Sequence, residues 1–388
     1  MALPPILCVA GPSGSGKTTL LERMIPALAV GGLRAGVVKR ASVELTFDAE
    51  GKDSSRLARA GAAASIASGT SGLVAHGRLD MALLDLAALC GPACDMVLAE
   101  GFKHSPLDKI AVLAAGDSSP PPADWPAVGL VVADQAGRPA GAVGRNDIAG
   151  VSAWVRAWFD RRKRLGEGVM GALLVGGRSS RMGADKAGMQ VRGRAVLPNL
   201  AEMLGGLLGE VWLIGGPARG IGMPKCVRWH LDIQYGRTGG IEEGRKGGRE
   251  DGRMGGWEDG RMGPLGGIAT ALRVAAVAGA SAALIVACDM PALTGRLLDF
   301  LLENRRRDSS ATILRNPITE RLEPLAGIYE QRALGPIEEA LDRGELSVTD
   351  LLRSIPAHVI DAPAEMAAEL ANINTPQELR EAELKPPP

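Results

Sequence analysis

A glycine-rich stretch near the amino end is the first part of the sequence that could do chemistry. It matches the pattern G-x-x-x-x-G-K-[ST], and it lies between an apolar run at residues 6–10 and a run with helical spacing that begins at Lys17. Glycines let backbone N–H groups approach a phosphate closely, the lysine ammonium reaches the outer phosphates, and the next hydroxyl can ligate Mg²⁺. We therefore predict a nucleotide phosphate site, with Thr18 also binding the metal, built from Gly11, Ser13, Gly14, Ser15, Gly16, Lys17 and Thr18.

A carboxylate should complete this site, because Mg²⁺ on a triphosphate also takes oxygen ligands from the protein. The apolar stretch at residues 95–100 has an acidic residue at each end, Asp95 and Glu100. Glu100 ends the predicted strand, at the edge where open α/β sheets bind ligands, whereas Asp95 opens it at the opposite edge. We therefore predict Glu100 as the second metal ligand. Asp53 is either the N-cap of a helix or a further carboxylate beside the metal.

A second glycine-rich stretch follows an apolar run at residues 172–175 and reads GGRSSRMGADK from Gly176. It differs from the first because no G-K-[ST] opens a helix. Backbone amides at Gly176 and Gly177 can wrap a triphosphate, while Arg181 and Lys186 neutralise the charge that develops as a phosphate bond breaks. We predict catalytic roles for Arg181 and Lys186. The alternative is a basic glycine turn that binds nothing.

Asp289 follows a very apolar run at residues 283–287 and is the predicted Mg²⁺ ligand of this second site. It lies at the carboxyl end of a strand, where a doubly wound sheet places its ligands. The alternative is that Asp289 caps the helix after Pro291. Asp232, which precedes another glycine-rich segment, would be unremarkable alone.

Strands and helices that alternate along the chain must position these residues. Such alternation indicates largely parallel sheets covered by helices, so the predicted fold is α/β with two doubly wound domains. In the first part, strands are expected at 6–10, 35–39, 95–99, 110–113 and 128–132, and helices at 17–30, 54–60, 81–89 and 148–159. In the second part, strands are expected at 172–175, 211–214, 227–229 and 283–287, and helices at 196–208, 265–278 and 297–304.

The predicted domain boundary follows Arg164, which gives domains at residues 1–164 and 165–388. The basic run at residues 161–164 is interpreted as cations that complement a helix dipole and precede a flexible linker. Residues 236–263 contain eleven glycines and repeat the string EDGRMG. A segment of this composition buries too little apolar surface to offset its ordering entropy, so we expect a mobile insertion within the second domain.

Composition excludes several classes of protein. Lys and Arg together number 44, as do Asp and Glu, and aromatic residues make up 3% of the chain, so we expect no nucleic-acid partner. The five cysteines are spaced irregularly, which predicts neither a disulfide framework nor a zinc site. With no basic leader and no apolar run near 18 residues, we expect no membrane association and a cytoplasmic protein.

The first part resembles the molybdopterin-guanine dinucleotide biosynthesis adapter family, MobB, over about residues 3–162. The resemblance rests on the phosphate-loop pattern, the AEGFKH block at residues 99–104, and shorter matches at 51–54, 60–62, 109–110 and 146–147. The EGFKH block is much more specific than a phosphate loop alone. This sequence departs from the family at residues 39–44, where relatives often carry histidines. The resemblance implies a P-loop NTPase-like domain that binds GTP and assists as an adapter.

The second part resembles the molybdenum cofactor guanylyltransferase family, MobA, over residues 169–384. LVGGRSSRMGADK, GPLGGI, ACDMP, EPL and NINTP occur in the family's order. The resemblance implies a Rossmann-like nucleotidyltransferase domain with Asn374 near the metal or the pterin, and with nucleotide contacts at Leu174, Val175, Gly176, Gly177, Lys186 and Asp232. Ile214 stands where some relatives present an asparagine to the nucleotide, and the segment at 236–263 is longer than the usual connection.

Taken together, the resemblances imply molybdenum cofactor biosynthesis. The second domain would transfer GMP from MgGTP to molybdenum-molybdopterin, giving molybdopterin-guanine dinucleotide and pyrophosphate. The implied cofactor is Mg²⁺, and the implied partners are GTP, molybdenum-molybdopterin, upstream molybdenum-insertion proteins and recipient molybdoenzymes. Three alternatives stay open: a cytidylyltransferase for the same pterin, a sugar-phosphate nucleotidyltransferase, and a non-catalytic nucleotide-dependent carrier of the cofactor.

Overall fold

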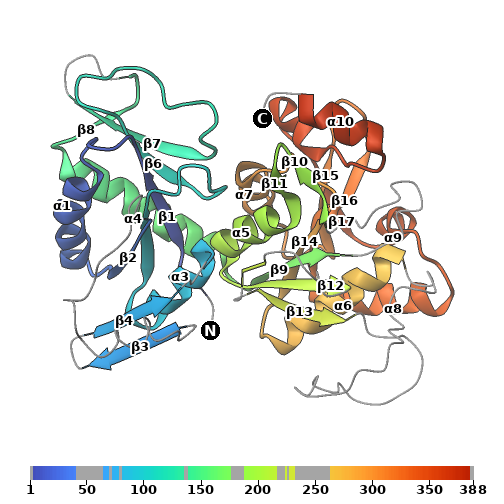
Figure 1. The fold of residues 1–388 in the computed structure, drawn as a ribbon. Coiled ribbons are helices and arrows are strands. Elements are labelled where there is room, and N and C mark those ends of the chain that lie inside the picture. Colours follow the sequence, from blue (N-terminus) through green and yellow to red (C-terminus); the bar gives the residue numbers. More distant parts are fainter. Residues whose placement is uncertain are drawn as a thin grey trace.

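The structure is a computed structural model of the chain. It describes residues 3–40, 64–69, 72–77, 81–134, 139–175, 188–215, 223–224, 227–231 and 263–384. Within these ranges the chain forms two α/β units, one built on a six-stranded sheet and the other on a seven-stranded sheet (Figure 1). None of the described helices is long and apolar enough to cross a membrane.

The first sheet is parallel throughout its described pairings, as the alternation of elements predicts. The strand order is β2-β5-β1-β6-β7-β8, so that β1 lies at the centre. Its strands are β1 (Ile6–Ala10), β2 (Ala35–Lys39), β5 (Met96–Glu100), β6 (Lys109–Val112), β7 (Val128–Ala133) and β8 (Val143–Gly144). All five residues of β1 are buried, because helices cover both faces of the sheet.

Alternate residues of β1 separate the two faces. Leu7 and Val9 pack against α1 (Lys17–Val30) and α4 (Ile148–Gly166), whereas Ile6 and Cys8 pack against α3 (Leu83–Cys90). A strand turns successive side chains to opposite faces, and this period of two accounts for the division. The strands β3 (Ala64–Gly69) and β4 (Gly72–Gly77) also pair with each other, antiparallel, in a separate small sheet. The sequence patterns did not predict that pair, and the predicted helix at 54–60 lies outside the described residues.

The second sheet is mixed. Its order is β13-β12-β9-β14-β16-β15-β17, and β16 runs antiparallel to both of its neighbours. Its strands are β9 (Val169–Leu174), β12 (Val211–Gly215), β13 (Arg228–Leu231), β14 (Ala282–Ala287), β15 (Ala311–Arg315), β16 (Leu322–Glu330) and β17 (Ala357–Asp361). The predicted strands correspond to β9, β12, β13 and β14. The last three strands in chain order were not predicted.

Helices cover both faces of this sheet as well. One core contains residues of α5 (Val196–Leu208) and α7 (Gly295–Glu303), and the other contains residues of α6 (Gly263–Val277), α8 (Leu334–Asp342) and α9 (Val348–Ser354). The helix α10 (Pro376–Leu384) follows the last strand, and a small ribbon of β10 (Gln190–Val191) and β11 (Arg194–Ala195) precedes α5. Nearly all of the predicted insertion at 236–263 lies outside the described residues.

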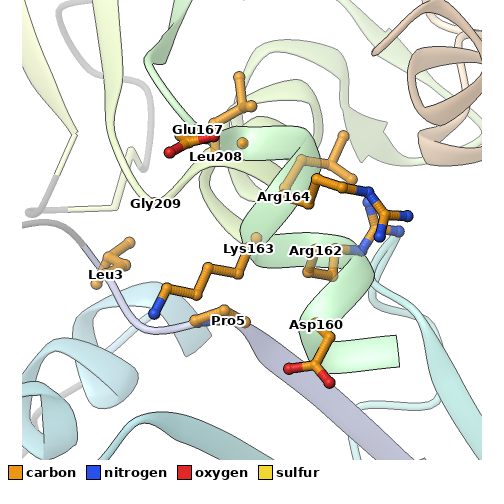
Figure 2. Close-up of a pocket in the computed structure, with 12 residues that line it drawn as sticks. Leu3, Pro5, Asp160, Arg162, Lys163, Arg164, Glu167, Leu208 and Gly209 are labelled. Atoms are coloured by element: carbon orange, nitrogen blue, oxygen red, sulfur yellow. The ribbon is translucent and has the colours of Figure 1, made fainter. Parts of the chain in front are cut away.

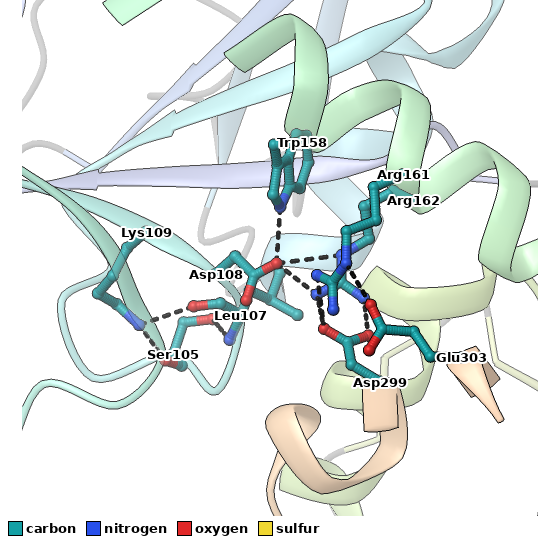
Figure 3. A network of polar contacts seen from close by, with 9 residues as sticks. All are labelled: Ser105, Leu107, Asp108, Lys109, Trp158, Arg161, Arg162, Asp299 and Glu303. Carbon is teal, nitrogen blue, oxygen red and sulfur yellow. Dashed lines mark hydrogen bonds and ion pairs between the residues drawn. The ribbon is translucent and has the colours of Figure 1, made fainter. Parts of the chain in front are cut away.

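The basic run at 161–164 corrects one expectation. Lys163 and Arg164 do lie in the last turn of α4, but only two residues separate this helix from β9, so the expected flexible linker is wrong. Arg162 is 3% exposed and donates to two carboxylates, from Nε to Asp108 at 3.0 Å and from Nη2 to Asp299 at 2.7 Å (Figure 3). Because α4 covers the first sheet and Asp299 belongs to α7, which covers the second, this arginine links the two α/β units.

Further contacts join the same surfaces. Ser105 Oγ donates to Glu202 of α5 at 2.6 Å, and Leu107 packs so closely on α5 that a methyl group at Gly206 would collide with it. Beside this junction lies a groove of about 490 Å³ lined by Leu3, Pro5 and the end of α4 (Figure 2). Leu3 and Pro5 precede β1, so the groove lies at the opposite edge of the sheet from the phosphate loop.

Candidate functional site

The predicted phosphate loop lies between the end of β1 and the start of α1. Gly16 caps the helix in the left-handed region, with φ 85° and ψ 17°. Among the described side chains none caps this helix, so the first N–H groups of α1 stay available to a ligand. Gly11 could not be replaced by a larger residue without a clash, because an added methyl group would overlap Val112 O. The loop therefore has the backbone of an anion site.

Lys17 folds back on this loop. Its Nζ donates to Gly11 O at 3.0 Å and to Pro12 O at 2.6 Å, and burial lowers its pKa. A phosphate oxygen entering the loop would replace these carbonyls as the acceptor. Ser15 is 1% exposed, and its Oγ has no hydrogen-bond partner among the described residues.

Thr18 and Glu100 meet, as the sequence predicts for two ligands of one metal ion. Thr18 Oγ1 lies 3.0 and 3.1 Å from the two carboxylate oxygens of Glu100, whose side chain is 8% exposed. A hydroxyl and a carboxylate this close are hard oxygen donors of the kind that Mg²⁺ prefers. Asp95, at the other end of β5, pairs instead with Arg34 at 3.0 Å. Its position agrees with the choice of Glu100, and Asp53 lies outside the described residues.

Lys39 joins this pair, although the sequence patterns did not predict it as a member of the site. Its Nζ lies 3.0 Å from Glu100 Oε1 and 3.2 Å from Thr18 Oγ1. Lys39 ends β2 directly beside Glu100 at the end of β5. The signal was present in the sequence, because the carboxyl ends of neighbouring parallel strands meet at one edge. Lys39 and Lys17 together give this edge two ammonium groups.

The second site lies at the carboxyl edge of the second sheet. Leu174 at the end of β9 pairs with Ala287 at the end of β14, and Asp289 follows two residues later. Val175 N donates to Ile214 O at 2.8 Å. The remaining predicted members, Gly176, Gly177, Arg181, Lys186 and Asp232, lie outside the described residues, so the structure brings together only part of the predicted set.

Ile214 is fully buried and packs in the core beneath α6. An isoleucine there offers a nucleotide no polar side-chain contact, and its carbonyl is already used by Val175. Recognition of a base must therefore come from other residues than the side chain at this position.

Two segments later in the chain, one at Glu323 and one at residues 372–374, reach the same edge of the sheet. Ile373 N donates to Asp289 O at 2.9 Å, and Asn372 Nδ2 donates to Glu323 at 3.4 Å. Burial raises the pKa of the Glu323 carboxyl to about 7, and the nearby charge of Asp289 acts in the same direction. Asn374 lies on this segment too, and its backbone N–H donates to Glu378 at 2.6 Å. Glu323 is thus a second carboxyl group near the predicted metal ligand.

In the part of the chain that the structure describes, no three His, Cys, Asp or Glu side chains gather as a metal-binding cluster. Mg²⁺ commonly binds through one or two carboxylates together with substrate phosphates rather than in a cage made only of protein. The donor sets at both sites fit that mode of binding.

Comparison with known proteins divides the chain in the same way. Residues 6–134 match the family described as molybdopterin guanine dinucleotide synthesis protein B (MobB), and residues 171–359 match the MobA-like NTP transferase domain. The chain is 40% identical over 117 residues to the molybdopterin-guanine dinucleotide biosynthesis adapter protein of Escherichia coli, covering 29% of this chain and 67% of that protein.

The second part matches other relatives over most of their length. It is 30% identical over 212 residues to the probable molybdenum cofactor guanylyltransferase of Opitutus terrae, covering 54% of this chain and 91% of that protein. A protein of the same description from Pelotomaculum thermopropionicum is 29% identical over 217 residues, covering 55% and 90%. The chain therefore belongs to two families, MobB in its first part and the MobA-like NTP transferases in its second.

Proposed function

We propose that this chain acts in molybdenum cofactor biosynthesis, transferring GMP from MgGTP to molybdenum-molybdopterin. The observation that supports this proposal most directly is the position of Asp289, a carboxylate just beyond β14 and beside the end of β9. Ligands of open α/β sheets bind at this edge. The described functions of relatives in both families point to the same pathway.

The proposed reaction is a nucleotidyl transfer. An oxygen of the pterin's terminal phosphate attacks the α-phosphorus of GTP, the bond from that phosphorus to the bridging oxygen of the β-phosphate breaks, and pyrophosphate leaves with the electron pair. A phosphate monoester has its second pKa near 6, so its oxygen is largely deprotonated near neutral pH and needs no histidine base. Catalysis then consists of aligning two polyanions and neutralising their charge.

This chain's residues divide that work. Asp289 would hold Mg²⁺, which when bound supplies positive charge to the triphosphate oxygens. Arg181 and Lys186, with the amides of Gly176 and Gly177, would neutralise the charge on the leaving pyrophosphate. Leu174, Val175 and Asp232 would contact the nucleotide.

The first domain is proposed to bind GTP as an adapter. Lys17 and the loop amides would hold the phosphates, and Thr18 with Glu100 would hold Mg²⁺. The 3.0 Å separation of the Thr18 and Glu100 oxygens and the open start of α1 support this assignment. Partner proteins would be those that supply molybdenum to the pterin and those that receive the finished cofactor.

The test incubates the full chain with the molybdenum-loaded pterin, Mg²⁺ and each NTP in turn, and measures pyrophosphate and dinucleotide. We expect both products with GTP. Turnover with CTP alone would make the protein a cytidylyltransferase, and pterin binding without pyrophosphate would make it a carrier; either result would overturn the proposal.

Two substitutions assign the residues. Asp289→Asn keeps the side-chain shape and removes the charge, so transfer should fall by about a hundredfold or more. The control Asp350→Asn makes the same substitution at an exposed residue of α9, which pairs with Arg353, and should leave transfer unchanged. Near-normal transfer by Asp289→Asn would contradict its proposed role. Lys17→Ala should abolish GTP binding by the first domain, and an unchanged dinucleotide yield would show that this domain is dispensable.

A further inference from the structure

Arg145 lies close to the phosphate loop although it is 128 residues away from Lys17 in the chain. It follows the short strand β8, where its backbone N–H donates to Ala133 O at 2.8 Å. Its side chain is 22% exposed and runs back across the ends of β7 and β6. The sequence patterns gave this residue no role.

Each of the three guanidinium nitrogens of Arg145 donates a hydrogen bond to a different segment of the chain. Nε donates to Asp134 Oδ1 at 2.8 Å, Nη2 donates to Leu113 O at 2.8 Å, and Nη1 donates to Ser15 O within the phosphate loop. The second oxygen of Asp134 accepts from Gly116 N at 2.9 Å, and the bond from Arg145 lowers the pKa of this carboxyl. The planar fork of arginine suits such a three-way contact, which a lysine could not reproduce.

Anchoring the carbonyl of Ser15 has a direct consequence for the loop. The C=O of Ser15 and the N–H of Gly16 belong to one planar trans peptide, in which they point in opposite directions. With the oxygen held by Arg145, the N–H of Gly16 is aimed away from the guanidinium. Gly16 also permits this approach, because an added Cβ would lie 2.8 Å from Arg145 Nη1.

We propose that Arg145 is a positioning residue that fixes the phosphate loop in its anion-binding shape, through the Ser15–Gly16 peptide rather than by contact with the nucleoside. The inference rests on the proposed binding of GTP by the first domain. A loop held in place before the ligand arrives loses less conformational entropy on binding. The effect must therefore appear for any ligand that presents a polyphosphate to the loop.

The test measures binding of GTP and of inorganic tripolyphosphate, each with Mg²⁺, to the full chain by calorimetry. Lys17→Ala identifies the first-domain binding event, since that event disappears in this variant. Arg145→Ala is compared with Arg145→Lys and with the control Arg23→Ala. Arg23 is exposed on α1 and donates only to Asn146 at 2.9 Å among its described contacts, so the control removes a nearby charge without freeing the loop.

We expect Arg145→Ala to weaken both ligands by the same factor, roughly ten- to a hundredfold, which is the usual effect of losing charge-assisted hydrogen bonds. Arg145→Lys should recover only part of this loss, and Arg23→Ala should stay within about twofold of the parent protein. If Arg145→Ala does not fold, Asp134→Asn loosens the same guanidinium and should weaken both ligands equally, by a smaller factor.

Three results would overturn the inference. A loss confined to GTP would mean that Arg145 contacts the nucleoside, full recovery by Arg145→Lys would mean that only its charge matters, and unchanged affinity in a folded Arg145→Ala would mean that it has no role. If the parent protein binds neither ligand, or if Lys17→Ala leaves binding unchanged, the proposed function of the first domain fails instead.

Discussion

Replacing Arg162 with alanine is expected to destabilise the protein by about 3–5 kcal/mol, which is the usual cost of removing one partner from a buried ion pair. The side chains of Arg162 and Asp299 are 3% and 8% exposed, and Asp108 contacts the same guanidinium. The substitution leaves two carboxylates without this cation, and little water can reach Asp299 to replace it. Arg161, which lies 3.2 Å from Asp299, offsets part of the loss, so we expect a value near 3 kcal/mol.

Urea unfolding measures this loss, with far-UV circular dichroism as the probe and each transition fitted separately because a two-domain chain need not unfold in one step. The matched control is Arg161→Ala, which removes the neighbouring cation from a more exposed position, 35% accessible, and should cost at most about 1 kcal/mol. Arg162→Met combined with Asp299→Leu removes the two most buried charges and should restore much of the stability, since apolar groups of similar size often replace buried ion pairs without loss. Asp108 stays charged in this variant, but its side chain is 23% exposed to water and still accepts a hydrogen bond from Trp158 Nε1 at 2.6 Å.

If Arg162→Ala costs less than about 1 kcal/mol, no more than its control, the reasoning that this buried arginine stabilises the junction is refuted. An equal loss in Arg162→Ala and in the double variant would also refute it, because the cost would then come from lost packing and not from an uncompensated charge.

Three further outcomes are expected. Glu100→Gln keeps the shape of the side chain but removes its charge. The factor by which Mg²⁺ increases the affinity of the first domain for GTP should therefore be at least about tenfold smaller than in the parent protein, measured by calorimetry with and without the ion. Gly206→Leu overfills the contact with Leu107 and should cost about 1–3 kcal/mol in thermal unfolding; an unchanged melting temperature would contradict the close approach. Because burial raises the pKa of Glu323 to about 7, folding takes up a proton between about pH 4.5 and 7, so stability falls as pH rises through this window. Glu323→Gln should flatten that slope of melting temperature against pH, and an equally steep slope in the variant would show that another group titrates.

Local patterns were enough to predict the first domain's central elements. The run at residues 6–10 is apolar throughout because helices cover both of its faces, and the glycine-rich loop that follows marks the change from strand to helix. The same reasoning found β9 and β14, which are also buried along their whole length. The strand-end rule that selected Glu100 also applies to Lys39, which the structure places beside it.

Contacts between distant parts of the chain could not be read in this way. Arg162 and Asp299 are 137 residues apart, and the basic run around Arg162 has the same composition as an ordinary helix end. Only the packing of α4 against α7 turns it into an interdomain contact. Arg145 and Ser15, 130 residues apart, are a second case. A pattern of residue types shows which side chains are basic, but not which carbonyl or carboxylate they will meet.

The direction of β16 explains why Glu323 reaches the second site. At the edge of a sheet where the parallel strands end, an antiparallel strand that lies between them begins. Val286 of β14 pairs with Ala326 of β16, and each step forward along β14 is matched by one step back along β16. Asp289 follows β14 by two residues and Glu323 is the second residue of β16, so both carboxyl groups lie at this edge, in agreement with the influence of Asp289 on the pKa of Glu323. Alternating strands and helices predict parallel strands and give no sign of the antiparallel β16, so residue patterns alone could not bring these two carboxyl groups together.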